Sequence, residues 1–383
     1  MDRVSGGKRV VLVGGGHAHL YSLRRAKEFL RRGAEVVLVA PQGHHYYSGM
    51  GPGLLSGHYR PEEARVDVAA LAAGAGCAFL RERVVSVDPE ARLLRLEGGQ
   101  AVPYDLVSFN TGSRVPTERI PGAARVATAV KPVENLERLR ERLLRKRTGG
   151  AVRVLVVGGG AAGVEVAGNL WLLAREGALQ LEITVCEAAD RLLPGLPARA
   201  GALAFRSLRS RGIVVRTGLG LGRLEGGGAQ ATSGEVLVYD EAVLTVGIVP
   251  GDLYRLSGLP AGPDGGLLVD AFLRSPRYPE VFGGGDCIHF APHPLPRVGV
   301  YAVRQAPVLF RNLLAALEGK APEPFRPQRR YLLILNLGNG NGLAVWGGLT
   351  ACGRWALRWK DRLDRAFLRQ FQESGTGAGS AGD

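Results

Sequence analysis

The chain has 383 residues, more than the roughly 250–300 at which a single hydrophobic core stops growing, so its length predicts two domains. Its formal net charge of +14 suggests that the protein binds nucleic acid. The basic residues are spread along the chain, however, which favours an ordinary solvated surface, or attraction to an anionic membrane, over nucleic-acid binding. Four isolated cysteines exclude a disulfide framework and a zinc site, and no apolar run reaches the roughly 18 residues needed to cross a bilayer.

The first predicted element is an apolar strand over residues 9–13, followed by a helix and by a second strand over residues 35–40. Because the first strand begins so early, it leaves no room for a signal peptide, and we expect a protein of the reducing cytoplasm. The order strand, helix, strand predicts one βαβ unit of a parallel sheet.

The turn after the first strand carries part of a dinucleotide-binding fingerprint. Gly14 and Gly16 occupy its first two glycine positions, where the missing Cβ lets the turn close and lets a pyrophosphate approach the helix N-terminus. His19 replaces the third glycine, and Ala40 and Pro41 stand where an acidic residue usually ends the second strand. This first motif is therefore incomplete.

A loop rich in glycine and aromatic residues follows the second strand, and we expect its backbone to wrap a flat ligand. Its histidine pair suggests a metal site, but no carboxylate or cysteine completes a ligand set at a suitable spacing, so none is predicted. Short antiparallel strands are predicted at 84–87, 92–96 and 101–103. Residues 105–110 return to the parallel sheet, and Thr111 and Gly112 close that strand.

The strongest motif begins with a strand over residues 152–157. The glycines that follow it stand in full GxGxxG spacing: Gly158, Gly160 and Gly163. A helix comes next, and then a strand over residues 181–186 that ends at Glu187. A carboxylate there accepts hydrogen bonds from a ribose 2′-hydroxyl and repels a 2′-phosphate, so the motif predicts NADH in preference to NADPH.

Glu165 lies in the helix that follows the second motif. An acidic side chain near a helix N-terminus is stabilised by the helix dipole and can simply be a surface residue. Its alternative place is near a bound nicotinamide. The sequence leaves both interpretations open.

The second motif is followed by the same succession of elements as the first. Short strands are predicted at 223–224, 229–232 and 235–239, and the strand after them ends at Gly247, which indicates two lobes of one plan. A last glycine run leads to Asp286, whose carboxylate can accept hydrogen bonds from polyol hydroxyls. The helix predicted at 303–317 offers its N-terminal amides to an electron-rich carbonyl.

The C-terminal part predicts two strands, at 329–336 and 342–346, and then a helix beyond Gly353. On that helix, one face is apolar and arginines lie beside it: Trp355, Trp359, Leu363, Ala366 and Phe367, with Arg354, Arg358, Arg362, Arg365 and Arg369. Burial against the chain's own first lobe would explain the apolar face alone. Binding to an anionic membrane surface through residues 354–371 explains both faces and is preferred. Residues 373–383 are predicted to be disordered.

With both lobes and the Asp286 segment assembled, residues 8–325 resemble the two-dinucleotide-binding-domain flavoproteins of the pyridine nucleotide-disulfide oxidoreductase superfamily. The resemblance implies an α/β fold with two Rossmann-like domains, an NADH domain (116–252) inserted in an FAD domain (1–115 and 253–325), and a short C-terminal strand-and-helix segment (326–372). The residues implied to contact FAD are Gly14, Gly16, His19, Ala40, Pro41, Thr111, Gly112 and Asp286. Those implied to contact NADH are Gly158, Gly160, Gly163, Glu187 and Gly247.

Within that superfamily the chain is most similar to the type II NADH:quinone dehydrogenases. The similarity rests on Val39-Ala40-Pro41 with the aromatic loop, on Val303-Arg304-Gln305, and on the C-terminus rich in Trp and Arg. The aromatic loop lacks the CxxxxC of the disulfide reductases, which excludes a dithiol relay. The quinone-site pattern AQxAxQ is only partly met, because Val300 takes the first Gln position and Gln305 is displaced by one.

The resemblance implies an FAD-dependent enzyme that takes hydride from NADH and passes two electrons to a membrane quinone, with Glu165 and Gln305 near the reacting centres. It implies a cytoplasmic protein, peripheral on the inner face of the cell membrane, and it leaves a homodimer open. The alternatives are a soluble reductase of a small electron-transfer protein, an enzyme like the sulfide:quinone reductases, and a flavin-containing redox sensor.

Overall fold

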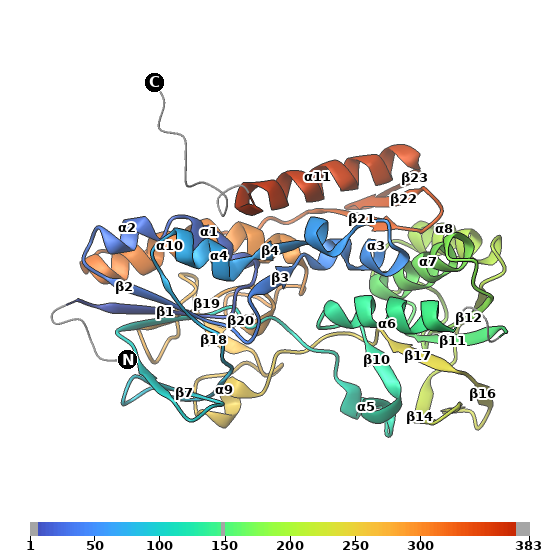
Figure 1. Ribbon diagram of the computed structural model, residues 1–383, viewed down its shortest axis with the longest axis horizontal. Coiled ribbons are helices and arrows are strands. Elements are labelled where there is room, and N and C mark those ends of the chain that lie inside the picture. Colours follow the sequence, from blue (N-terminus) through green and yellow to red (C-terminus); the bar gives the residue numbers. More distant parts are fainter. Residues whose placement is uncertain (1–6, 147–149, 373–383) are drawn as a thin grey trace.

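The computed structural model describes residues 7–146 and 150–372 and contains two five-stranded parallel sheets (Figure 1). In the first sheet the strand order is β19, β9, β1, β2, β5: Val281–Gly283, Leu106–Phe109, Arg9–Val13, Glu35–Val39 and Ala78–Leu80. Every residue of the central strand β1 is buried. This burial is typical of a parallel strand covered on both faces.

Helices and short strands surround the first sheet. The helices are α1 (His17–Arg24), α2 (Lys27–Leu30), α4 (Val68–Gly74), α9 (Leu253–Leu256) and α10 (Gly299–Glu318), with 3-10 turns η1 (Ser48–Met50), η2 (Pro61–Ala64) and η4 (Gly285–Cys287). The short helix α3 (Gly51–Ser56) packs instead against two helices of the second half, α6 (Glu134–Arg145) and α7 (Ala161–Glu176). The antiparallel strands are β3 (His44–Tyr46) with β4 (Arg65–Asp67), and β6 (Val84–Asp88), β7 (Leu93–Leu96) and β8 (Ala101–Pro103). A parallel pair, β18 (Leu267–Val269) and β20 (Ile288–Phe290), flanks β19.

The second sheet repeats the plan of the first. Its strand order is β10, β17, β11, β12, β13: Ala127–Ala129, Glu241–Leu244, Val152–Val157, Leu181–Cys186 and Val214–Arg216. Its helices are α5 (Ala123–Val126), α6 (Glu134–Arg145), α7 (Ala161–Glu176) and α8 (Ala198–Arg209), with the turn η3 (Thr117–Arg119) before them. Its antiparallel strands are β14 (Leu221–Glu225), β15 (Gly228–Ala231) and β16 (Val236–Val238).

The chain completes the second sheet between two strands of the first. Strands β10 to β17 follow β9, and the chain then returns to the first sheet at β19. This order confirms the predicted α/β class with two Rossmann-like units. The borders at residues 115 and 252 stay predictions.

The C-terminal segment bridges the two halves of the molecule. It consists of β21 (Leu332–Asn336), β22 (Gly342–Trp346), β23 (Leu349–Gly353) and α11 (Arg354–Gln372). In Figure 1 the red helix α11 runs from the side of α7 and α8 across to the helices above the first sheet. The sequence missed β23, and the predicted disordered tail lies outside the described residues. None of the helices within residues 7–146 and 150–372 combines the length and apolarity needed to cross a membrane.

Candidate nucleotide sites and the C-terminal helix

The first glycine turn is built around Asn110. Gly14 has φ +91°, and a Cβ at Gly14 or Gly16 would clash with the backbone or side-chain oxygen of Asn110. The Asn110 side chain accepts a hydrogen bond from Ala18 N (3.0 Å) and donates one to Gly284 O (2.6 Å). Asn110, which belongs to no recognised sequence motif, therefore ties this turn to the glycine run before Asp286.

His19, at the third glycine position, is fully buried between α1 and the sheet. Its Nδ1 lies 2.7 Å from Gly14 O and its Nε2 lies 2.8 Å from Ser108 Oγ. Burial lowers the pKa of His19 to about 4, so the ring is neutral at pH 7. Both nitrogens have protein partners and none is left for a cofactor. The side chain packs the helix against the strand, and the predicted contact of His19 with FAD stays a prediction.

Asp286 lies in η4 at the end of β19, beside the first glycine turn. Its Oδ2 accepts hydrogen bonds from Ser113 Oγ and from Lys131 Nζ, each at 2.8 Å, and Lys131 Nζ also lies 2.8 Å from Ser113 Oγ. The two donors leave Oδ1 as the oxygen that can accept from a ligand hydroxyl. Lys131 comes from the connector before α6, and no sequence motif marks it.

The other predicted FAD residues line the same edge of the first sheet. Ala40 and Pro41 follow β2, with Ala40 buried and Pro41 exposed. Thr111 follows β9, and its Oγ1 lies 2.8 Å from Tyr254 OH. Gly112 has φ +74°, a conformation that favours glycine. Their contacts with a cofactor stay predictions.

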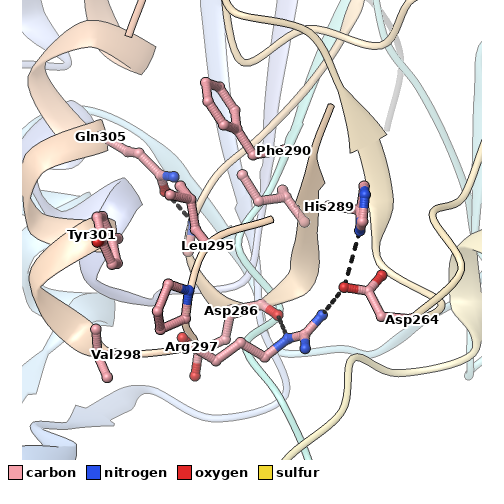
Figure 2. Close-up of a pocket in the computed structure, with 12 residues that line it drawn as sticks. Asp264, Asp286, His289, Phe290, Leu295, Arg297, Val298, Tyr301 and Gln305 are labelled. Atoms are coloured by element: carbon pink, nitrogen blue, oxygen red, sulfur yellow. Dashed lines mark hydrogen bonds and ion pairs between the residues drawn. The ribbon is translucent and has the colours of Figure 1, made fainter. Parts of the chain in front are cut away.

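A small cavity of about 20 Å³, room for one water molecule, lies beside Asp286. Figure 2 shows the residues that line it. Arg297 closes it by donating from Nε to Asp286 O (2.9 Å) and from Nη2 to Asp264 Oδ2 (2.6 Å). His289 Nδ1 lies 3.1 Å from the same Asp264 oxygen. This cluster fixes the loop that leads into α10 and is too small to hold a nucleotide.

Gln305 lies inside α10 and is buried. Its Oε1 accepts a hydrogen bond from Gly285 N at 2.7 Å (Figure 2). The helix starts at Gly299, four residues before the predicted start at Val303, and Gln305 is one of its buried residues. The predicted place of Gln305 near the reacting centres stays a prediction. Gln305 positions the turn that carries Asp286.

The second glycine turn brings the helix α7 into close contact with the end of strand β11. Gly158 has φ +106°, and a Cβ at Gly163 would clash with Gly158 O. Thr245 Oγ1 holds the turn by donating to Val157 O (2.7 Å) or Gly158 O (2.8 Å). No protein atom lies within 4 Å of a Cβ at Gly160, whose φ of −69° any residue adopts. A ligand passing close to the backbone explains the glycine at this position, so the turn fits a dinucleotide pyrophosphate.

Glu187 caps the second turn from the end of β12. Its Oε2 accepts from Gly159 N (2.6 Å) and its Oε1 from Ala189 N (2.8 Å). Each oxygen keeps a second lone pair that can accept from a ribose hydroxyl. Gly247, after β17, has φ +67° and open space around it. The predicted contacts of Glu187 and Gly247 with NADH stay predictions.

Glu165 lies in α7 under the C-terminal segment. Its Oε1 accepts a hydrogen bond from Asn336 N at 2.7 Å. Burial raises the pKa of Glu165 to about 7, and the nearby positive charge of Lys360 opposes this shift. The interpretation as an ordinary surface residue is therefore wrong. Whether the carboxyl reaches a nicotinamide stays a prediction.

The inward face of α11 carries an ion pair. Lys360 Nζ donates to Asp364 Oδ2 (2.5 Å) and to Gly49 O (2.6 Å), and both side chains are buried. The sequence did not single out this pair, because arginines dominate the helix and mask a lysine and an aspartate four residues apart. The pair fixes α11 to the aromatic loop of the first half.

The outward face of α11 carries the tryptophans. Trp355, Trp359 and Leu363 are 51%, 45% and 47% exposed, and the arginines beside them are exposed as well: Arg354, Arg358, Arg362 and Arg369. Phe367, predicted on the same face, instead lies partly buried against the first half of the chain. The alternative interpretation, in which the whole apolar face of α11 is buried against the first lobe, is therefore wrong. The strands before the helix add two exposed residues that the sequence did not assign, Trp346 and Leu349.

The family profile described as pyridine nucleotide-disulphide oxidoreductase matches residues 8–306. A ferredoxin--NAD(+) reductase component of an anthranilate 1,2-dioxygenase system from Burkholderia cepacia is 33% identical over 264 residues, 66% of this chain and 62% of that protein. The alignment thus spans less than two thirds of that reductase. The demethylphylloquinone reductase NdbB from Synechocystis sp. is 25% identical over 357 residues, 89% of this chain and 87% of that protein.

Among solved structures, the sulfide:quinone oxidoreductase from Aquifex aeolicus superposes with a TM-score of 0.80 at 17% identity. The match covers 96% of this chain and 92% of that one. At this identity the similarity shows the fold alone, and it extends through the C-terminal segment beyond the profile.

Proposed function

Because the chain belongs to the pyridine nucleotide-disulphide oxidoreductase family, we propose that it is an NADH dehydrogenase that uses FAD and delivers two electrons to a membrane quinone. FAD and NAD(P)H are the cofactors that the family and the related proteins indicate. Bound FAD supplies the hydride and electron chemistry, so no side-chain nucleophile is required.

In this proposal each glycine turn holds one nucleotide. The first turn and Asp286 hold FAD, with Lys131 adding a positive charge beside them. The second turn holds NADH, and Glu187 selects it over NADPH by repelling a 2′-phosphate. The open space at Gly160 supports the second assignment, since the protein alone does not require a glycine there.

Glu165 is proposed to serve the nicotinamide end of the second site. A carboxyl with a pKa of about 7 can hold or release a proton at neutral pH. It is anchored by Asn336 of the C-terminal segment, so the position of the carboxyl depends on how that segment packs.

The observation that carries the quinone assignment is the two-sided character of α11. Its inner side joins Lys360 and Asp364 to the aromatic loop, while its outer side presents Trp355 and Trp359 beside arginines. Tryptophan at headgroup depth with arginine toward anionic lipid is typical of a helix lying in a membrane interface. The proposal therefore includes a peripheral position on the inner face of the cell membrane.

A vesicle experiment tests the membrane assignment. Wild-type protein should sediment with phosphatidylglycerol vesicles, and the double variant Trp355→Ser/Trp359→Ser should bind at least roughly tenfold more weakly, equivalent to about 1.4 kcal/mol. Leu256→Ser is the matched control, because Leu256 is 70% exposed on α9, away from this helix. FAD content and apparent Tm report that each variant is folded. Equal sedimentation of the double variant and the control would contradict the membrane assignment.

A reductase of a small electron-transfer protein is the second candidate. The Burkholderia cepacia relative carries the name of a ferredoxin reductase component, and the net charge of +14 would suit an acidic partner. Reduced enzyme that is reoxidised rapidly by an acidic [2Fe–2S] ferredoxin and slowly by quinone would favour this candidate.

A sulfide:quinone activity has less support. It would need accessible cysteines near the flavin, but Cys77, Cys186 and Cys287 are buried. Cys352 is exposed on β23, on the outer sheet of the C-terminal segment.

A further inference from the structure

Two histidines from different elements meet beneath α11. His17 is the first residue of α1, and His45 is the middle residue of β3. His45 Nε2 lies 3.1 Å from His17 Nδ1, and the two rings are perpendicular with centroids 4.6 Å apart. The distance and the crossed rings indicate one shared hydrogen bond.

The other nitrogen of His17 has no protein partner. Its Nε2 is buried, and no hydrogen-bond partner lies near it among the described residues. A buried polar atom without a partner costs free energy, so such atoms usually meet a ligand or water. The orphan nitrogen therefore indicates that a ligand atom comes to His17.

Aromatic rings and charged groups define where that ligand would lie. The His17 ring stacks on Phe367 of α11 (centroids 5.7 Å apart) and contacts Tyr47 of the aromatic loop (5.1 Å). Burial and the nearby carboxylate of Asp364, the partner of Lys360, raise the pKa of Tyr47. His17 thus sits between the first glycine turn and the inner face of the proposed membrane helix.

Both histidines are neutral at pH 7. Burial lowers the pKa of His17 to about 4 and that of His45 well below its usual value, and Lys131 lowers both further. The titratable groups that face the pair are Tyr47 from the loop, Asp364 from α11 through Tyr47, and Lys131 from the connector. A neutral pair stores no extra proton, but it can pass one along by exchanging tautomers.

The proposed reaction requires one proton from water. NADH + H⁺ + quinone gives NAD⁺ + quinol, in which the hydride brings two electrons and one proton. We propose that His17 and His45 relay the second proton to a quinone carbonyl oxygen that contacts His17 Nε2. This inference rests on the proposed quinone acceptor, because an iron–sulfur protein takes electrons without a proton.

The relay balances at each atom. A proton enters at His45 Nδ1, the proton on His45 Nε2 moves to His17 Nδ1, and the proton on His17 Nε2 moves to the quinone oxygen. Both rings remain neutral in the other tautomer and return by exchange with water between turnovers. A metal site is not the alternative, because no group of three or more His, Cys, Asp or Glu side chains in the described part of the chain could hold a metal ion.

The test separates reduction of the holoenzyme from its reoxidation. His17→Phe keeps an aromatic ring against Phe367 and Tyr47 but removes both nitrogens. The variant keeps the backbone amides of the glycine turn, so we expect FAD to stay bound, and reoxidation by menadione to slow by about 10²-fold relative to bleaching by NADH, the usual scale of general acid catalysis. Fluorescence quenching of the oxidised holoenzyme, with no NADH present, should show weaker menadione binding.

The variant His45→Phe distinguishes a residue that relays the proton from a residue that contacts the quinone directly. It should slow reoxidation as His17→Phe does, yet leave menadione affinity unchanged, because His45 does not touch the acceptor. His17→Gly leaves space for a small molecule, and free imidazole should restore its reoxidation rate. His44→Phe is the matched control, since His44 is a neighbour on β3 that pairs with Asp67 at the surface (3.6 Å).

The outcomes separate the two levels of the proposal. If menadione fails to reoxidise the wild-type enzyme, the proposed function fails. If menadione reoxidises the wild type and both His17 and His45 variants equally fast, the relay is wrong and the function stands. Equal slowing of bleaching and of reoxidation in His17→Phe would show that His17 acts on the flavin, which also overturns the relay.

Discussion

The two glycine turns solve one packing problem in opposite ways. In the second turn, Gly163 brings α7 so close to the strand that a Cβ would clash with Gly158 O. In the first turn, His19 fills the corresponding space and binds Gly14 O and Ser108. The third position of the fingerprint therefore sets how the helix meets the sheet. A departure there does not argue against nucleotide binding.

The turns also differ at the end of the neighbouring strand. The first has the buried Ala40, whereas the second has Glu187, which is held by Gly159 N and Ala189 N. Only the second turn thus presents a carboxylate that can discriminate between nucleotides. This difference agrees with the proposal of a resident FAD in the first turn and an exchangeable NADH in the second.

The largest effect is expected from adding a methyl group to the second turn. Gly163→Ala forces the helix away from Gly158 O, which should cost about 1–3 kcal/mol of unfolding free energy and abolish reduction by NADH. Gly160→Ala, three residues earlier, meets no protein atom and should keep its stability while losing roughly tenfold or more in NADH affinity, about 1.4 kcal/mol. Thermal unfolding and NADH titration measure both. Equal stability of the two variants would contradict the proposed packing role of Gly163.

A smaller effect is expected at the carboxylate. Glu187→Arg replaces a group that repels a 2′-phosphate with one that attracts it, so kcat/KM for NADH should fall and that for NADPH should rise, each by roughly tenfold, about 1.4 kcal/mol. Steady-state kinetics with a small quinone measure the change. Unchanged preference would exclude Glu187 from the nucleotide site.

The smallest effect is the acid sensitivity of the first turn. The pKa of His19 is lowered to about 4 in the folded chain, so below its ordinary value of 6.5 the unfolded chain binds a proton that the folded chain does not. The contribution of neutral His19 to the free energy of unfolding is therefore fully present above pH 6.5 and is lost as the pH falls toward 4. The apparent Tm of His19→Gln should decline less over this range than that of the wild type. A parallel decline would show that other groups, such as His17 and His45, dominate.

Local patterns in the sequence predicted the parallel strands, both glycine turns and the C-terminal helix. They could do so because hydrophobic period and glycine spacing act over a few residues. Asn110 and Lys131 were missed because their partners, Gly284 and Asp286, lie more than 150 positions away along the chain. The one available signal was that Asn110 directly precedes Thr111 and Gly112, which had already been assigned to the site.

Side-chain direction on helices was harder to predict. The pattern predicted the start of α10 at Val303, four residues after the observed start at Gly299. On α11, counting apolar residues put Phe367 beside the tryptophans, while the structure turns Lys360 and Asp364 inward. Burial of an ion pair depends on the partner Gly49 O, and no local pattern reports such a partner.

The central claim is that this chain carries two electrons from NADH through FAD to a quinone. The most direct measurement is a double-mixing stopped-flow experiment in which NADH first bleaches the holoenzyme and menadione or an acidic [2Fe–2S] ferredoxin is then added. The account predicts reoxidation by menadione, one molecule per flavin, fast enough to support steady-state turnover. Reoxidation by the ferredoxin alone, or by neither acceptor, would contradict it.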